Sequence, residues 1–123
     1  MGEEKEGLIR AAIAEALIKF EKEYMGRGPK DARVYLVDNL VIVRLRGVLT
    51  QAELKLIGSS EPAKGRDLIK RVRRELIEVG RPLLEAAIEK ITGSRVESIH
   101  TDISTVTGER IVVFTLLGGP EKS

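Results

Sequence analysis

The sequence predicts an α+β fold, a two-layer sandwich in which two long helices pack on a four-stranded antiparallel sheet. Two observations support this prediction. The order helix, short link and β-hairpin occurs twice, from Ile9 to Gly47 and from Leu68 to Gly118. Apolar residues recur at three-to-four spacing in the helical segments and gather in β-branched runs in the hairpins. The chain is therefore predicted to be an internal α-β-β duplication, with half-units at about 7–58 and 59–119.

The length of 123 residues suits one hydrophobic core, so we predict a single domain over 1–123 with a disordered tail at 120–123. The N-terminus is polar and acidic, and the sequence holds no long apolar run. We therefore expect no membrane-spanning segment, no secretory signal and a cytoplasmic location. Cysteine is absent, which excludes disulfides and thiolate sites.

The charge balance argues against a nucleic-acid-binding polycation. The chain has 21 basic and 19 acidic residues and a net charge of +2. Asn39 and Gln51 are its two side-chain amides, whereas Glu, Lys and Arg are abundant. This bias is typical of thermophilic proteins, so we expect a thermophilic source.

The first half contains a helix followed by a tight hairpin. The helix carries an apolar stripe from Ile9 to Tyr24 and is expected to end at Gly26. Asp38-Asn39 suits a two-residue turn between strands 33–37 and 40–46. That turn pairs Val37 with Leu40, Tyr35 with Ile42 and Arg33 with Arg44. The opposite face should meet the helices: Val34, Leu36, Val41, Val43 and Leu45.

A short helix is predicted from Gln51 to about Ile57. Thr50 and Glu53 form a capping box at its start, and Gly58 is expected to end it.

A long helix is predicted to follow over 61–92, with Gly80-Arg-Pro82 inside it. Because an internal proline removes a helix hydrogen bond, we expect a kink or a break there. The predicted apolar stripe of this helix comprises Leu68, Ile69, Val72, Leu76, Val79, Leu83, Leu84, Ala87, Ile88 and Ile91.

The last hairpin is predicted to pair Val96–Ser104 with Arg110–Leu117 around a turn near Gly108. If a pseudo-twofold axis relates the halves, the strand order is either 1-2-4-3 or 2-1-3-4. The first is preferred because the second strand of each hairpin is the more apolar, and central strands are the more buried.

His100, Asp102 and Ser104 share one face of the predicted strand. This row could bind a metal or act as a general base held by a carboxylate. It could equally be a hydrogen-bonded row on a partly exposed strand. The second interpretation is favoured because the sequence holds no other His and no Cys. We therefore predict no catalytic residue, no metal site and no cofactor.

Two further segments could bind anions. Gly26-Arg27-Gly28 could offer backbone amides and a guanidinium, although a helix terminator explains the glycines equally well. The long helix is locally basic, but pairs such as Asp67 with Arg71 can neutralise its charges, so we expect its basic residues to be solvated. Only four aromatic residues are available for base stacking, so nucleic acid is an unlikely partner. The basic residues concerned are Lys64, Arg66, Lys70, Arg71, Arg73, Arg74 and Arg81.

The central strand runs LVIVRL and RIVVFTLL are apolar at nearly every position, although a one-sided antiparallel sheet should alternate. Two helices can cover only one face. We therefore expect a second copy of the chain on the other face, as a homodimer. Arg33, Tyr35, Arg44 and Arg46 would then surround an interface or an anion pocket.

The segments EKEYMGRGP, LVIVRLRGVLT, RRELIE, RPLLE and ITG with HTDISTVTGERIVVFTL resemble the MpsC-type family. They span about Ile9 to Leu117. The resemblance implies a place in a Na⁺-translocating system that generates membrane potential, with components of that system as partners. It also implies that His100, Asp102, Gly108 and Glu109 and the Gly26–Pro29 link matter to the family.

Three functions follow as hypotheses. The first is a non-enzymatic, soluble accessory or regulatory component of that ion-translocating system, because a chain without a membrane span cannot itself move an ion across a bilayer. The second is a small-ligand or anion-binding regulatory module that uses Arg44, Arg46, His100 and Asp102. The third is an enzyme that uses His100 and Asp102.

Overall fold

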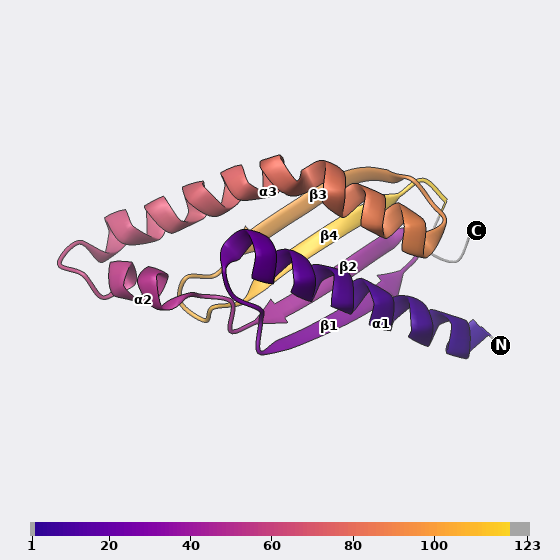
Figure 1. Cartoon of the computed structure of the whole chain (residues 1–123), viewed down its shortest axis with the longest axis horizontal. Coiled ribbons are helices and arrows are strands. Elements are labelled where there is room, and N and C mark those ends of the chain that lie inside the picture. Colours follow the sequence, from indigo (N-terminus) through magenta and orange to yellow (C-terminus); the bar gives the residue numbers. More distant parts are fainter. Residues whose placement is uncertain (1, 119–123) are drawn as a thin grey trace.

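The computed structural model describes residues 2–118 and has two long helices on one face of a four-stranded antiparallel sheet (Figure 1). This confirms the predicted α+β two-layer fold. The predicted tail 120–123 lies outside the described residues. The elements are α1 (Gly2–Phe20), η1 (Glu21–Met25), β1 (Asp31–Val37), β2 (Leu40–Arg46), α2 (Gln51–Ile57), α3 (Pro62–Thr92), β3 (Val96–Ile103) and β4 (Arg110–Leu116).

The strand order is β1-β2-β4-β3, which confirms the preferred of the two predicted orders. The central strands β2 and β4 come from different halves of the chain and pair antiparallel. Their helix-facing apolar side chains are fully buried and form the middle of the core. These are Val41, Val43, Leu45, Val112, Phe114 and Leu116, all 0% exposed.

The first hairpin has the predicted register. Its partners include Val37 with Leu40, Tyr35 with Ile42 and Arg33 with Arg44. Asp38 takes a positive φ of 54° in the two-residue turn, as such a tight connection requires. A turn of this length fixes which face each side chain occupies, and the predicted inner face is confirmed.

The first helix ends at Gly26 as predicted, with φ 87° at that glycine. It begins at Gly2 and changes after Phe20 to one π-helical turn, η1. Besides Phe20, its buried residues are Ile9, Ile13, Leu17, Glu21 and Met25, which stand four apart. Four-residue spacing drifts by about 40° per step around an α-helix, and a wider π turn takes up this drift. Glu21 and Met25 thus stay on the inner face.

Helix α3 runs from Pro62 to Thr92 without interruption, so of the kink or break predicted at Gly80–Pro82 the break is wrong. Gly80 is buried where α3 passes the rings of Phe20 and Tyr24. This packing holds the helix across the proline. Glu78, whose carbonyl would have accepted from residue 82, lies on the exposed side, where water can replace the lost hydrogen bond.

The predicted apolar stripe of α3 is only partly buried. Leu68, Val72, Val79 and Leu83 are between 42% and 70% exposed. The 31 residues of α3 span about 46 Å, whereas strands of seven or eight residues span about 25 Å. The N-terminal part of α3 therefore extends past the sheet together with α2, as Figure 1 shows. The four exposed residues each stand one position before a buried one, namely Ile69, Arg73, Gly80 or Leu84, so they lie beside the buried face of the helix and not on it.

The capping box of α2 is present as predicted. Glu53 N donates to Thr50 Oγ1 at 3.2 Å and Thr50 N donates to Glu53 Oε1 at 2.9 Å.

The last hairpin is one residue shorter than predicted on each strand and has a bulge between Val96 and Ser98. Gly108 takes a φ of 75° in its turn.

Replacing Gly80 by alanine should destabilise the protein by about 1–3 kcal/mol, because a methyl group there would overlap the Phe20 ring, with Cζ only 2.8 Å away. Phe20 is 4% exposed and stacks on Tyr24 with 4.5 Å between the ring centroids, so a shift of its ring would also disturb this stack. Gly7→Ala is the matched control, since the nearest atom to a Cβ at that helical position is 3.9 Å away. It should stabilise by about 0.5–1 kcal/mol. Urea denaturation measures both, and equal effects would contradict this packing.

Candidate functional site

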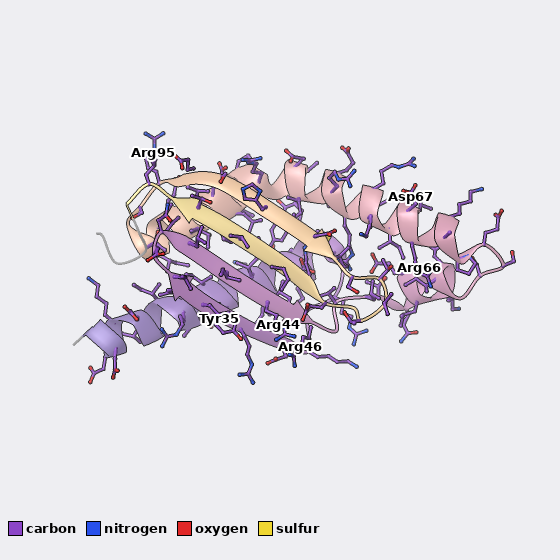
Figure 2. The ribbon with its side chains drawn as sticks, turned by 180° about the vertical axis from the view of Figure 1, so that it is seen from behind. Tyr35, Arg44, Arg46, Arg66, Asp67 and Arg95 are labelled. Carbon is purple, nitrogen blue, oxygen red and sulfur yellow. The ribbon has the colours of Figure 1, made fainter. Side chains whose placement is uncertain are left out.

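The face of the sheet turned away from the helices carries three rows of side chains (Figure 2). No helix among residues 2–118 lies over this face. The strand register defines the rows, each running across the strands in the order β1, β2, β4, β3. They are Arg33, Arg44, Ile111, Asp102; then Tyr35, Ile42, Val113, His100; then Val37, Leu40, Thr115, Ser98. We call these twelve residues the open face.

The open face is apolar in the middle and polar at its two edges. Its central strands contribute Leu40, Ile42, Ile111 and Val113, which are partly exposed although apolar. On β1, Tyr35 is 43% and Val37 is 47% exposed. An apolar surface without a cover is typical of an interaction site for another protein.

Arg44 and Arg46, two of the predicted ligand-binding residues, lie at one end of β2. Arg44 forms an ion pair with Glu109 in the turn before β4, and this hydrogen bond raises the pKa of Arg44. Arg46 is exposed and stands opposite Asp31 in the register. The predicted turn residue Glu109 therefore neutralises the predicted ligand-binding residue Arg44.

His100 and Asp102 share a face of β3 as predicted, but they have different partners. His100 Nε2 lies 3.4 Å from Ser98 Oγ, and Asp102 Oδ1 lies 3.5 Å from Lys70 Nζ. Ser104 does not continue their row, because β3 ends at Ile103. Its hydroxyl instead accepts from the backbone amides of the following turn, those of Val106 and Thr107.

The two predicted loop segments meet at the link between β2 and α2. Arg27 Nη1 donates to Leu49 O at 3.1 Å, and Val48 N donates to Gly108 O at 3.1 Å. Gly26 and Gly28 give the first segment its turn out of η1. These segments thus hold one link in place at the end of the sheet where a buried charge cluster lies.

This cluster consists of Glu21 from η1, Arg73 from α3 and Arg110 from β4, which are at most 2% exposed. Glu21 Oε1 accepts from Arg73 Nη1 at 3.3 Å, and Glu21 Oε2 lies 3.5 Å from Arg110 Nη1. Arg73 also donates through Nε and Nη2 to the two carboxylate oxygens of Glu53, at 2.7 Å each, and to Val48 O at 3.0 Å. One buried carboxylate is therefore shared by two guanidinium groups.

Burial shifts the ionisation of this cluster. It raises the pKa of Glu21, although both arginines oppose the shift, and it lowers the pKa of Arg110. For Glu53, the hydrogen bonds from Arg73 and Thr50 outweigh burial, so its pKa is lowered. Glu21 Oε2 and Arg110 Nη1 face each other without a hydrogen bond, which leaves this contact the weakest of the cluster.

The cluster corrects the prediction that the basic residues of α3 are solvated, because Arg73 is buried. The sequence does contain a signal for it. Arg73 stands four residues from Ile69 and from Ile77, both buried, and Glu21 stands four from Leu17. Arg110 alternates with buried Val112. Each of these three charged residues lies at an inward position of a different element. Their charges neutralise one another only when the three elements have come together in the fold.

A small hollow of about 50 Å³ opens beside the cluster, between α3 and the edge strand β3. Arg74 lines it from an exposed position, and Asp102 lies at its rim with Lys70. The remaining lining residues are Arg73, Thr101, Ile103 and Arg110. Among residues 2–118, no three His, Asp or Glu side chains come together in a way that could hold a metal ion.

Arg73→Ala should destabilise the protein by about 3–5 kcal/mol, because it leaves Glu21 charged and partly unpaired in the core. Arg71→Ala is the control, since Arg71 pairs with Asp67 on the exposed side of the same helix. That change should cost at most about 0.5 kcal/mol. Chemical denaturation measures both, and a small loss for Arg73→Ala would mean that the cluster is unimportant for stability.

Acidification should show how much the ionised Glu53 carboxylate contributes to the stability of the folded protein. Its pKa is lowered from 4.5 in the folded protein, so its stabilising effect is complete at neutral pH and is lost as the pH falls through the folded value. Glu21 acts in the opposite direction, because its pKa is raised. Between about pH 5 and pH 3, the Tm of the wild type should fall more steeply than that of Glu53→Gln. Parallel Tm curves would contradict the assigned shift.

Comparison with known proteins places the chain in a family. No helix among the described residues is both long and apolar enough to cross a membrane. The chain is 42% identical over 117 residues to the Uncharacterized protein YbcI of Bacillus subtilis (strain 168). The aligned region covers 95% of this chain and 92% of that protein. No solved structure matches. The family model described as Na⁺-translocating membrane potential-generating system (MpsC) matches residues 5–117, and the chain belongs to this family.

Proposed function

We propose that the chain is a non-enzymatic accessory or regulatory component of a Na⁺-translocating, membrane potential-generating system, and that it acts as a homodimer. The family description supports the link to such a system. The observation that carries the accessory role is the open face, whose apolar centre has no cover among residues 2–118. An uncovered apolar surface of this kind marks an interaction site.

The polar groups near this surface favour binding over chemistry. His100 is paired with Ser98, Asp102 with Lys70 and Arg44 with Glu109. A general base needs a partner that orients it toward a substrate, and it usually lies in a cleft. His100 instead lies on a flat, exposed edge strand.

The test is carried out in the source organism with this gene deleted. Na⁺-dependent membrane potential is measured with a potential-sensitive dye. Deletion should lower it, and the wild-type chain should restore it. Ile42→Glu should fail to restore it, because a charge is placed at the centre of the open face. Val106→Glu is the control, since Val106 is 84% exposed in the turn before β4.

Circular dichroism and Tm must show that Ile42→Glu is folded, and Tyr35→Glu serves as a second variant at a more exposed position of the same face. An unchanged potential after deletion would reject the proposed role. Full complementation by His100→Gln is expected, because glutamine keeps a polar side chain at this position of the open face but cannot act as a general base. Failure of a folded, dimeric His100→Gln protein would favour the enzyme hypothesis instead.

A second candidate, an anion-binding regulatory module, is favoured by the hollow beside Asp102. Lys70 and Arg74 line it on the outside, and the buried Arg73 and Arg110 line its inner wall. Lys70 and Arg74 are accessible and could bind a small anion such as inorganic phosphate. This places the candidate site nearer to Asp102 than to the other predicted residues Arg44, Arg46 and His100.

Inorganic phosphate should raise the Tm of the wild type if this second candidate is correct, because a ligand of the folded state stabilises it by mass action. The rise should be lost in Arg74→Ala and kept in Arg71→Ala, which removes an equal charge from the same helix outside the hollow. No rise at millimolar phosphate, or an equal rise in both variants, would reject it.

A further inference from the structure

The open face is asymmetric in charge across the sheet. Arg33 lies on one edge strand, β1, and Asp102 lies in the same row on the other edge strand, β3. Between them stand Arg44, which Glu109 neutralises, and the apolar Ile111. The row therefore has a positive end and a negative end, with an apolar or neutralised middle.

We propose that the open face binds a second copy of this chain about a twofold axis that runs parallel to the strands, between β2 and β4. This deepens the homodimer of the proposed function by naming the geometry of the contact. Rotation about such an axis exchanges the two edges of the sheet and keeps each row at its own level. β1 of one copy then faces β3 of the other.

The charges of the two copies become complementary in this arrangement. Arg33 of each copy faces Asp102 of the other, so the same contact forms twice. In the middle row, Tyr35 faces His100 of the second copy, and Ile42 faces Val113. Sheets that pack face to face keep their strands within about 30° of each other, which preserves this row order.

The other simple twofold axis runs across the strands and does not give this complementarity. It places each strand over its own copy, β1 on β1 and β3 on β3. No position along that axis brings Arg33 to Asp102. When the axis passes through their row, Arg33 faces Arg33 and Asp102 faces Asp102, which is repulsive. The charge pattern thus selects the axis parallel to the strands.

The ion pairs that the two charged residues form within their own copy are exposed. Arg33 Nε lies 3.4 Å from Asp31 Oδ2, and Asp102 Oδ1 lies 3.5 Å from Lys70 Nζ. Asp102 Oδ1 also accepts from Ile103 N at 2.8 Å, whereas its other oxygen, Oδ2, takes part in neither contact. The side chains of Arg33 and Asp102 are 64% and 80% exposed, and surface pairs of this kind contribute little, so both residues are accessible to a second copy.

Charge exchange tests the contact. Analytical ultracentrifugation at low salt measures the dimer Kd for the wild type, Arg33→Asp, Asp102→Arg and the double variant. Each single change should weaken the dimer by at least about tenfold, because it sets like charges against each other. The double variant should return to within about threefold of the wild type. Arg66→Asp, an equal charge change on the opposite helical layer, should leave the Kd unchanged.

Cysteine cross-linking tests the axis independently, and the sequence contains no native cysteine to interfere. Arg33→Cys and Asp102→Cys proteins are mixed, allowed to exchange and treated with a short bismaleimide. The mixture should give a cross-linked dimer, whereas each protein alone should give little, since equal positions lie at opposite edges. Strong cross-linking of Tyr35→Cys alone would indicate the axis across the strands and overturn the proposal.

A monomer at all concentrations up to about 100 μM, far above the Kd of most specific homodimers, would also overturn it. The outcomes separate this proposal from the proposed function. If the dimer forms as described but deletion leaves the membrane potential unchanged, only the function fails. If the chain is monomeric while Ile42→Glu still abolishes the potential, the open face binds a different protein, and only the dimer fails.

Discussion

The relative positions of the first helix, the long helix and a central strand depend on one buried carboxylate, Glu21, which is shared by Arg73 and Arg110. Three elements contribute these charges: η1, α3 and β4. An isolated charge in the core costs several kcal/mol, so none of the three can be placed without the other two. The cluster therefore fixes α1, the long helix and a central strand relative to one another at one end of the sheet.

Glu53 extends this constraint to the short helix. One of its oxygens accepts from Thr50 N in the capping box, and both accept from Arg73. The same side chain thus begins α2 and attaches it to α3. α2 has no fully buried residue, so this ion pair adds to two packing contacts, that of the partly buried Ile57 with the core and the close approach of Gly65 to the Leu56 backbone.

Local chemistry made much of the fold predictable. The two-residue turn at Asp38-Asn39 sets the first hairpin, and the Thr50–Glu53 capping box sets α2. The buried cluster was not predicted, because Arg73 was assigned to the solvated side of a basic helix. Its burial depends on Glu21, which is 52 positions away in the sequence. Likewise, Gly80 keeps α3 continuous through a contact with Phe20 that no local pattern contains.

The strand order also governs how the chain must fold. Each hairpin pairs neighbours in sequence, but the central pairing joins residues as distant as Leu40 and Thr115. Closing that loop costs more entropy than closing either hairpin, and distant pairings slow folding. The intervening α3 shortens the search, because it returns the chain along the sheet as a rigid rod. Because β2 and β4 come from different halves, neither half can bury its central strand by itself, and we expect the two halves to fold as one cooperative unit.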